Sequence, residues 1–502
     1  MSEKKISLWM HEKEGPEYPV LTKRFKADVA VVGAGITGLT TGLLLKEAGM
    51  KVAVIEAGRI CSGTTGHTTA KVTALHNLIY SRLESTFGER TAGIFAAANS
   101  EAIAQVDSLV RQFGIDCSLN RLPAYTFTRD PNKVSELEKE VAAAGKAGLA
   151  ARLVKETDLP FPVEAAVRLD DQAQIHPVKY CTALAAQIEG GGSRIFEQSR
   201  VVEVTEKGVR TGYGVVAADK IVLATLLPFL DRGAFFVSNF PWRSYLLAAR
   251  LDGSMPAGMY ISAEEPVRSI SRTADGTMLL IGGESHKSGQ DPDTRRRYEV
   301  LENWAREHFP IRSIEFSWSS QDFMPADGLP YIGPLHPFTS RIYAATGFGK
   351  WGMTRGTFGA MLIRDLILGR ENPWQETFRT SRVSFIRSPG KLIFENMNVG
   401  RRFVQDRMGA YMTKKEEPPG AGEGRITRQG NKTAAVFREA DGGLQVLSPV
   451  CTHLGCYVAW NTAEQSWDCP CHGSRFDVDG SILHGPALKK LDKKDDGPQE
   501  KE

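Results

Sequence analysis

The sequence predicts an α/β and α+β protein that ends in a small all-β domain. A strand–helix–strand pattern with a glycine-rich turn occupies residues 28–56, and such units build parallel sheets. Residues from about 150 to 320 contain alternating apolar and polar segments, which are typical of a mostly antiparallel sheet. After residue 421, short strand-like segments surround two clusters of cysteine and histidine. The 502 residues are enough for two or three domains.

The composition is that of an ordinary globular protein, with 42% hydrophobic and 24% charged residues. The net charge of +3 and the lack of a basic aromatic patch argue against a nucleic-acid partner. Residues 1–27 form an N-terminal extension without an apolar signal core, which predicts a cytoplasmic location. The longest apolar run, residues 27–45, contains four glycines and is interpreted as a buried strand and helix, so no transmembrane segment is expected.

The pattern at residues 28–56 is a dinucleotide-binding fingerprint with its context intact. Gly33 permits the tight turn, Gly35 allows the backbone to approach a pyrophosphate, and Gly38 allows the helix to pack on the strand. The N-terminus of the helix offers free N–H groups to phosphate oxygens. Glu56 ends the second strand and is placed to accept hydrogen bonds from ribose hydroxyls.

Two further segments bear on which dinucleotide is bound. The run after Glu56 is rich in glycine and hydroxyl residues, including Thr64 and Thr65, and suits a longer cofactor such as FAD. Alternating strands between residues 200 and 225 begin near Val201. A strand at residues 341–346 leads into a third glycine turn and a helix that runs to Gly369.

The third turn, with Gly347, Gly349 and Gly352, also matches the fingerprint and raises the alternative of a second site for NADH. No strand ending in an acid follows about twenty residues later, as that fold requires. The sequence therefore favours a single dinucleotide cofactor.

Together these segments resemble the D-amino-acid oxidase / glycine oxidase family of FAD-dependent enzymes across residues 28–370. The resemblance implies a Rossmann-like FAD-binding domain with an interleaved, mostly antiparallel substrate domain at about residues 150–320. It places Lys350 near the flavin as a candidate catalytic residue, with a solvated loop lysine as the alternative. The positions that it implies for FAD binding are Gly33, Gly35, Gly38, Glu56, Thr64, Thr65, Val201, Gly347, Gly349, Gly352 and Met353.

Near the C-terminus, Cys451-Thr-His453 and Cys469-Pro-Cys471-His472 each combine cysteine with histidine. Zinc fingers usually keep cysteine pairs and histidine pairs apart. One cysteine and one histidine in each half suit a two-iron cluster in which one iron takes both sulfurs and the other takes both imidazoles. A zinc site and a disulfide knot with idle histidines are the alternatives.

This stretch resembles the cytochrome bc-type Rieske 2Fe–2S proteins over about residues 420–490. The resemblance implies that Cys451 and Cys469 bind one iron and that His453 and His472 bind the other. It further implies a disulfide between Cys456 and Cys471, a hydrogen bond from Ser474 to a bridging sulfide, and a proline loop at Gly485-Pro486.

One position departs from the Rieske pattern. Phe476 stands where high-potential members have a tyrosine that donates to a ligand sulfur. A missing donor stabilises the reduced cluster less, so we expect a reduction potential below that of the respiratory proteins.

Substrate residues are less clear in the sequence. Tyr245, Tyr260 and Arg272 are candidates to face a substrate carboxylate, although each also suits a structural role. His67 lies in the flavin loop and is a candidate to contact or link the cofactor, whereas His76 and His286 have no assigned role. No Ser-His-Asp or Cys-His pattern indicates hydrolytic chemistry.

Between the two resemblances, residues 371–420 predict an amphipathic helix that packs on the flavoprotein, followed by a short polar linker. The Rieske domain is expected at residues 421–490, and the charged residues 491–502 are expected to be a disordered tail.

The leading hypothesis is an FAD-dependent dehydrogenase with a small-molecule electron donor, an amine or amino acid by resemblance. Electrons would pass singly from the reduced flavin to the cluster and on to an unknown external acceptor. One alternative is a reductase component with the reverse flow, and another is a non-catalytic redox sensor. A Rieske oxygenase is disfavoured because the spacing of a two-histidine, one-carboxylate iron site is missing.

Overall fold

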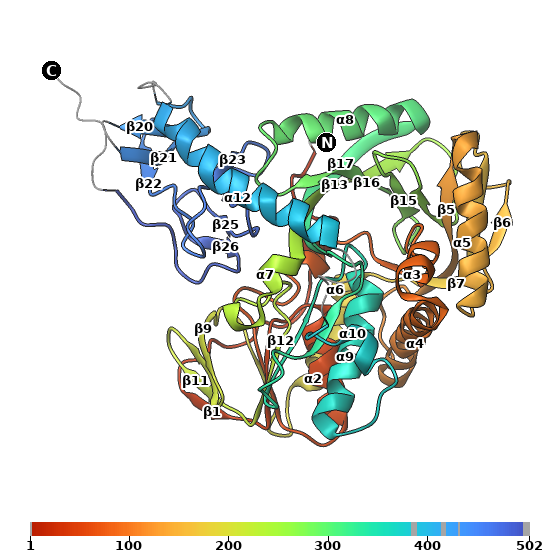
Figure 1. Ribbon diagram of the computed structural model, residues 1–502, viewed down its shortest axis with the longest axis horizontal. Coiled ribbons are helices and arrows are strands. Elements are labelled where there is room, and N and C mark those ends of the chain that lie inside the picture. The colour runs from red at the N-terminus through yellow and green to blue at the C-terminus, as the bar shows by residue number, and fades with distance from the viewer. Residues whose placement is uncertain (1–2, 383–388, 413–417, 430–431, 495–502) are drawn as a thin grey trace.

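The computed structural model describes residues 3–382, 389–412, 418–429 and 432–494. A large body contains a six-stranded sheet, a four-stranded sheet and a nine-stranded sheet, and a smaller β domain at the C-terminal end packs against it (Figure 1). This arrangement confirms the predicted fold class.

The six-stranded sheet is parallel except at one edge. Its order is β8-β3-β2-β12-β19-β18, and only β18 runs antiparallel to its neighbour. All residues of β2 and β3 are buried, as expected for a sheet covered on both faces. Its strands are β2 (Val29–Val32), β3 (Val52–Ile55), β8 (Arg194–Phe196), β12 (Lys220–Leu223), β18 (Tyr331–Pro334) and β19 (Ile342–Thr346).

Helices α2 (Ile36–Glu47), α6 (Pro177–Ile188) and α9 (Gly352–Leu368) pack together on one face of this sheet. A four-stranded sheet covers the other face, where its valines share an apolar core with β2 and β12. Its strands in order are β1 (Arg24–Lys26), β11 (Val215–Ala217), β10 (Gly208–Thr211) and β9 (Val201–Thr205).

The nine-stranded sheet is mostly antiparallel, and its strands alternate along the chain with those of the six-stranded sheet. It includes strands that precede residue 150, so it extends further along the chain than the range expected for the substrate domain. Helix α8 (Thr294–His308) packs on three of its strands. The strands are β4 (Lys71–Val72), β5 (Asn120–Thr128), β6 (Arg152–Val154), β7 (Ala165–Gln174), β13 (Asn239–Leu251), β14 (Met259–Ser262), β15 (Ser269–Arg272), β16 (Leu279–Lys287) and β17 (Ile311–Pro325).

Short helices and three longer ones complete the large body. They are α1 (Leu8–His11), the 3-10 turn η1 (Thr64–His67), α3 (Tyr80–Phe87), α4 (Glu89–Phe113), η2 (Pro131–Lys133), α5 (Val134–Lys146), η3 (Asp231–Gly233), α7 (Phe235–Ser238) and α10 (Gln375–Phe378).

The N-terminal extension is part of this body. Trp9 in α1 is only 1% exposed, and its indole N–H donates to the carbonyl of Thr68 at 2.7 Å. Strand β1 adds to the four-stranded sheet by pairing with β11. The first residues therefore support the segment in which the flavin loop was predicted.

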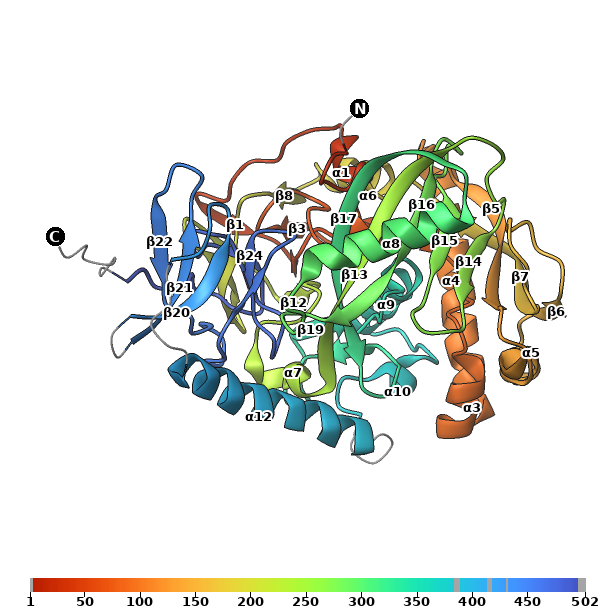
Figure 2. The ribbon, with the colours of Figure 1, turned by 90° about the horizontal axis from the view of Figure 1, so that it is seen from above.

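The C-terminal domain contains two small antiparallel sheets, β20-β21-β22 and β23-β24-β25-β26. Helix α12 (Pro389–Met412) confirms the predicted helix and runs along both this domain and the large body (Figures 1 and 2). The strands are β20 (Gly424–Gln429), β21 (Lys432–Arg438), β22 (Leu444–Leu447), β23 (Ala459–Asn461), β24 (Ser466–Asp468), β25 (Arg475–Phe476) and β26 (Ile482–His484).

Two predictions at the C-terminal end need comment. Residues 491–494 are ordered, contrary to the expected tail, because Leu491 is buried and the N–H of Lys494 donates to Val446 at 3.0 Å. Residues 495–502, and residues 413–417 of the predicted linker, lie outside the described part of the chain. Within the described ranges, no helix combines the length and apolar character needed to cross a membrane.

Candidate flavin and cluster sites

A cavity of about 730 Å³ opens at the carboxyl ends of the parallel strands. This edge is where open α/β sheets usually bind ligands. The predicted residues in its wall are Gly33, Gly35, Glu56, Thr64, Thr65, Val201, Lys350, Gly352 and Met353.

The glycines of the first turn fit a bound dinucleotide. Gly33 has a φ of +104°, and a Cβ added at Gly38 would lie 1.8 Å from the carbonyl oxygen of Gly33. Gly38 therefore does not line the cavity but lets α2 start directly against β2. The turn leaves the N-terminus of α2 facing the cavity, where its N–H groups would hold phosphate oxygens.

Glu56 lies at the end of β3, as predicted. Its carboxylate accepts hydrogen bonds from the N–H groups of Ala34 (2.8 Å) and Gly58 (2.9 Å). Burial raises the pKa of Glu56, and these two hydrogen bonds and nearby Arg200 oppose that shift. The carboxylate is thus fixed at the position where a ribose would lie.

The loop after Glu56 is fixed by its threonines. Thr64 Oγ1 donates to the carbonyl of Gln321 at 2.7 Å, and Thr65 Oγ1 accepts from the N–H of Ile36 at 3.1 Å. His67 also lines the cavity, and its Nδ1 lies 2.8 Å from the carbonyl oxygen of Gly63. These contacts attach the loop both to α2 and to β17.

The third glycine turn follows β19 and leads into α9. Gly347 and Gly349 have positive φ values of 75° and 57°, but neither lines the cavity. They shape the turn, whereas Lys350 reaches the wall and donates from Nζ to Ser285 Oγ at 2.7 Å. Desolvation by the surrounding wall lowers the pKa of Lys350 to about 8. The side chain is nevertheless exposed, so its role near the flavin stays a prediction, as does the alternative of a solvated loop lysine.

The candidate substrate residues separate clearly. Tyr245 lines the cavity, and its hydroxyl lies 2.9 Å from Nε2 of His286. Tyr260 instead stacks on Tyr125 with ring centroids 4.5 Å apart, outside the cavity wall. Arg272 is likewise absent from the wall.

His76 does not reach the cavity wall. It is buried, with Nε2 2.7 Å from the carbonyl oxygen of Thr73, and stacks on Trp351. These contacts indicate a structural role.

Lys71 also lines the cavity, although nothing in the sequence marks it except its place after the flavin loop. Its side chain is almost fully buried and donates from Nζ to Ser269 Oγ at 2.5 Å. Among the described residues, no carboxylate lies within ion-pair distance of it. Burial lowers its pKa to about 7. An isolated buried cation of this kind suits an anionic group of a ligand.

The structure also brings the four predicted cluster ligands together. The thiols of Cys451 and Cys469 contact each other, and this contact lowers the pKa of Cys451 to about 7 against the effect of burial. The rings of His453 and His472 meet edge to face with centroids 5.1 Å apart. A contacting pair of thiols and a contacting pair of imidazoles from the same two loops suit the two irons of a Rieske cluster.

The surrounding residues fit the same cluster. Cys456 and Cys471 form a disulfide, and both are buried, which protects the bond from reductants. Ser474 is fully buried, contacts Cys451 and accepts a hydrogen bond at Oγ from the N–H of Ala487 at 3.0 Å.

The two histidines that are predicted to bind the cluster face the large body. The ring of Phe236 in α7 contacts His453 at 5.9 Å and His472 at 5.3 Å between centroids. The side-chain amide of Gln321 donates from Nε2 to the carbonyl of Gly473 at 2.8 Å. The backbone carbonyl of Gln321 accepts a hydrogen bond from Thr64 in the flavin loop. Gln321 therefore contacts both sites.

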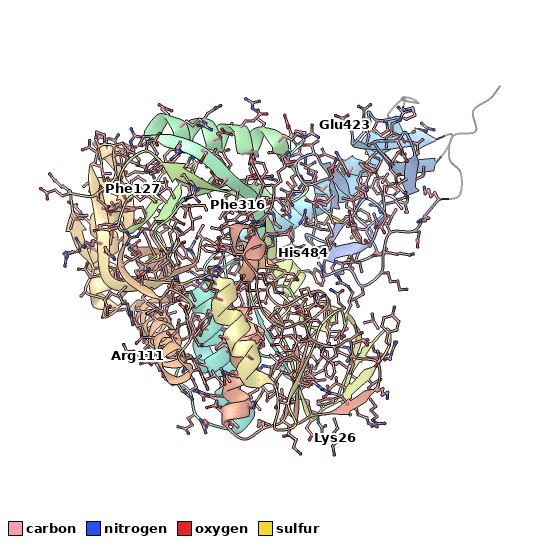
Figure 3. All side chains as sticks on the ribbon, turned by 180° about the vertical axis from the view of Figure 1, so that it is seen from behind. Lys26, Arg111, Phe127, Phe316, Glu423 and His484 are labelled. Atoms are coloured by element: carbon pink, nitrogen blue, oxygen red, sulfur yellow. A yellow bond between two sulfur atoms is a disulfide. The ribbon has the colours of Figure 1, made fainter. Side chains whose placement is uncertain are left out.

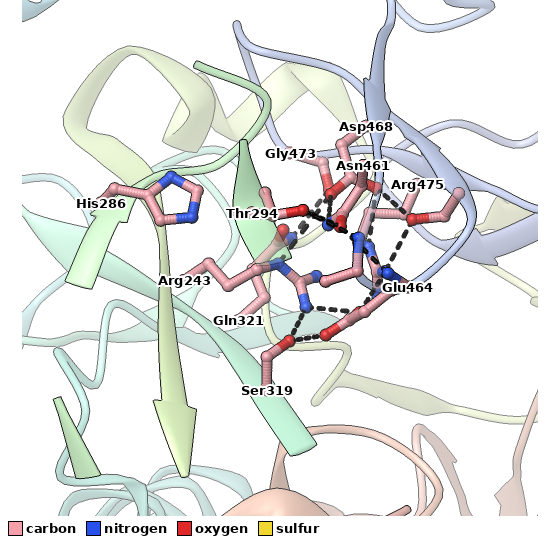
Figure 4. Close-up of polar contacts among 12 residues, drawn as sticks. Arg243, His286, Thr294, Ser319, Gln321, Asn461, Glu464, Asp468, Gly473 and Arg475 are labelled. Atoms are coloured by element: carbon pink, nitrogen blue, oxygen red, sulfur yellow. Dashed lines mark hydrogen bonds and ion pairs between the residues drawn. The ribbon is translucent and has the colours of Figure 1, made fainter. Parts of the chain in front are cut away.

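A buried ion network joins the two domains (Figure 4). Arg243 of β13 donates from Nη1 to Glu464 at 2.7 Å, and Arg475 donates to Glu464 at 2.5 Å and to Asp468 at 2.9 Å. Burial alone would raise the pKa of Asp468, but Arg475 and Arg243 outweigh it and hold the pKa below its usual range. The network balances two cations with two carboxylates.

The C-terminal domain also forms part of the cavity wall. Arg475 and residues 482–485, 487 and 488 face the cavity that contains the predicted flavin residues. Figure 3 labels His484 where this domain meets the large body. Because Ala487 is hydrogen-bonded to Ser474, this wall segment lies between the cavity and the cluster site.

Comparison with known proteins agrees with this geometry. The FAD dependent oxidoreductase family model matches residues 28–366, and the Rieske [2Fe-2S] domain model matches residues 411–494. The chain belongs to the FAD dependent oxidoreductase family. Its C-terminal end is a Rieske domain, so FAD and a 2Fe–2S cluster are its cofactors.

This FAD-dependent oxidoreductase resembles proteins of both kinds. It is 36% identical, over 96% of each chain, to YhfW of Bacillus subtilis (strain 168), whose name includes the description Rieske 2Fe-2S iron-sulfur protein. It is 24% identical to gamma-glutamylputrescine oxidoreductase of Escherichia coli (strain K12), over 78% of this chain and 96% of that one.

Solved structures share the fold of the flavoprotein part. Glycine oxidase from Geobacillus kaustophilus superposes with a TM-score of 0.61 at 21% identity, covering 72% of this chain and 99% of its own. L-proline dehydrogenase from P. horikoshii superposes with a TM-score of 0.60 at 19% identity, covering 72% and 98%. Both coverages leave the Rieske part of this oxidoreductase outside the likeness.

Proposed function

We propose that the protein is an FAD-dependent dehydrogenase that oxidises a small amine or amino acid and passes the electrons singly to its Rieske cluster and then to an external acceptor. The observation that carries this proposal is the shared wall. Residues 482–485, 487 and 488 line the flavin cavity, and Ala487 contacts Ser474 beside the cluster site. When bound, the flavin would accept an electron pair from the substrate, and the cluster would accept one electron at a time.

The chain's own residues give the substrate class its support. Lys71 would bind a carboxylate on the substrate side of the cavity, and Ser269 would hold its ammonium in place. Lys350, in the turn between β19 and α9, would be held by Ser285 of β16, the strand that pairs with the strand of Ser269. The names of two relatives, glycine oxidase and L-proline dehydrogenase, refer to amino acids and support the same class.

The cluster ligands would be Cys451, Cys469, His453 and His472, with the flavin held by the first turn, Glu56 and the third turn. Phe236 and Gln321 would keep the cluster end of the Rieske domain against the flavoprotein, which keeps the path between the cofactors short. A cytoplasmic location belongs to the same proposal, supported by Cys61, Cys117 and Cys181, which remain free thiols.

An anaerobic screen of amines and amino acids tests the proposal. The expected result is that a substrate bleaches the flavin first and that the EPR signal of the reduced cluster follows. A His472→Ala variant should still bleach with substrate but should lose electron transfer to an added one-electron acceptor. Equal reoxidation rates in the two proteins would refute the path through the cluster. Bleaching by NADH alone would instead support the reductase alternative.

A further inference from the structure

The solvent-facing side of helix α12 is unusually apolar. Of the fifteen large apolar side chains exposed among the described residues, six belong to α12. We define the outer face of α12 by the five most exposed of them, which are between 50% and 68% exposed. They are Ile393, Phe394, Met397, Val404 and Met408.

The opposite side of α12 is firmly attached to the protein. Leu392 is buried, Asn396 Nδ2 donates to the carbonyl of Val237 at 3.0 Å, and Lys287 pairs with Glu395 at 2.5 Å. Near the other end, Arg407 donates to the carbonyl of Gly455. The side of α12 that packs on the protein is therefore a different side from the apolar outer face. The outer face stays exposed although the helix is fully docked.

The outer face lies on the periphery of the molecule. Figure 2 shows α12 along one edge, and none of the described elements lies beyond it in that view. Ile393, Met397, Val404 and Met408 follow a spacing of four, seven and four residues, which keeps them on one side of a helix. An apolar strip of this kind marks an interaction surface.

The charges of α12 indicate what covers this strip. Lys391, Arg401, Arg402 and Arg407 stand against only two acids, and both acids are paired: Glu395 with Lys287 and Asp406 with Arg402. Arg401 beside the outer face is bonded to Gln405, not to a carboxylate. The apolar strip is therefore flanked by uncompensated positive charge.

A second copy of the chain fits this pattern less well. The outer face is symmetric about the Gly400–Arg401 pair, because Met397 mirrors Val404 and Ile393 mirrors Met408. A two-fold antiparallel pair of α12 helices would consequently bring the two Arg401 side chains together, with no acid on the outer face to separate them. An anionic surface has no such conflict.

We propose that the outer face of α12 docks the protein onto an anionic membrane surface, with the helix parallel to the bilayer. The apolar side chains would enter the boundary between headgroups and acyl chains, and the arginines would remain among the phosphates. This inference goes beyond the proposed function and does not depend on it. Because Arg407 joins α12 to the loop 451–456, docking would also bring the partly exposed Leu454 of the cluster loop close to the bilayer.

Flotation of the full-length holoprotein with lipid vesicles tests the proposal. The wild type should float with vesicles of phosphatidylcholine and phosphatidylglycerol at low salt, and binding should fall several-fold with phosphatidylcholine alone or at high salt. M397E/V404E should bind at least about tenfold more weakly, since two charges would enter the apolar boundary. Glutamate is a good helix former, so α12 should persist, which flavin and cluster absorbance would verify.

Phe338→Glu is the matched control, because Phe338 is 94% exposed and lies outside α12; this variant should bind like the wild type. Arg401→Gln should weaken binding only to the anionic vesicles. Failure of the wild type to float, or equal binding by M397E/V404E, would overturn the proposal. The proposal would also fail if the wild type sedimented as a dimer and did not bind vesicles, and if M397E/V404E sedimented as a monomer. A second copy of the chain would then cover the outer face of α12.

Discussion

The two redox sites of this molecule are built in opposite ways. The cluster site comes from two short loops, residues 451–456 and 469–474, within one small domain. The flavin cavity draws its wall from segments spread between Val32 and Leu488. The cluster site is complete within the C-terminal domain. The flavin cavity lies in the large body, but the C-terminal domain completes its wall.

The buried charges differ in the same way. At the domain junction, Arg243 and Arg475 are balanced by Glu464 and Asp468. In the cavity, Lys71 has only the hydroxyl of Ser269 as its partner among the residues that the structure describes. Balanced charges at the junction hold two domains in register, and an unbalanced charge in a cavity is available to a ligand.

A substitution in the first glycine turn tests the flavin cavity separately from the cluster site. Gly38→Val should abolish FAD binding, because even a Cβ at this position would lie 1.8 Å from the carbonyl oxygen of Gly33. The cluster should remain, since its ligands come from distant loops. Flavin absorbance per chain and the EPR signal of the reduced cluster measure the two outcomes. Gly93→Ala is the control, because nothing lies within 4 Å of its added Cβ. Loss of both cofactors from the Gly38 variant would show that the cluster site is not independent.

This contrast also explains what the sequence could predict. Cys451, His453, Cys469 and His472 are close in sequence, so their spacing and the resemblance to Rieske proteins predict the cluster, and the structure brings the two cysteines and the two histidines into contact. The glycine turns and the acid after the second strand are equally local signals. They led to the parallel part of the six-stranded sheet and to part of the cavity wall.

Contacts between distant segments had no such signal. Lys71 and Ser269 are nearly two hundred residues apart, and nothing near Lys71 in the sequence marks it as buried. The wall formed by residues 482–485 depends on how the domains dock. Tyr260 and Arg272 were candidates by residue type, but strand register places them outside the cavity wall.

The second prediction concerns the unbalanced charge. The pKa of Lys71 is about 7 in the folded protein, below its usual 10.5. Between these values the unfolded chain holds a proton that the folded protein lacks, so the free energy of unfolding should rise with pH from about 7 to 10.5. Lys71→Met should remove this rise and stabilise the substrate-free protein by up to about 5 kcal/mol below pH 7.

Denaturant unfolding at several pH values would measure the slope. Lys139→Met, on an exposed position of α5, should keep the slope of the wild type. If the free energy of unfolding of Lys71→Met changed with pH as steeply as that of the wild type, the pKa of Lys71 would not be lowered by folding. Another group would then already compensate the charge of its ammonium. Its proposed contact with a substrate carboxylate would then lose its basis.

Removing one cation from the ion network between the domains tests how much this network contributes to stability. Arg243→Met leaves the carboxylates of Glu464 and Asp468 with fewer cations in a buried environment and should cost about 3 kcal/mol of stability. Arg210→Met removes an exposed pair with Glu203 and should cost less than about 1 kcal/mol. Chemical unfolding followed by flavin fluorescence compares the two variants. Equal losses would indicate that the junction network contributes no more than a surface pair.

A conservative substitution in the C-terminal domain tests the cluster site and leaves the flavin cavity unchanged. Phe476 is fully buried in β25 among the cluster-domain core, where the Rieske pattern has a sulfur-binding tyrosine. Phe476→Tyr should raise the reduction potential of the cluster by tens of millivolts, because a hydroxyl donor stabilises the more negative reduced state. An EPR-monitored redox titration measures the shift, and the flavin potential should stay constant. Phe437→Tyr, beside Trp460 in the same core, is the matched control and should leave the potential unchanged. A potential that does not move in Phe476→Tyr would mean that the hydroxyl cannot reach a ligand sulfur, and that Phe476 is not the cause of a low potential.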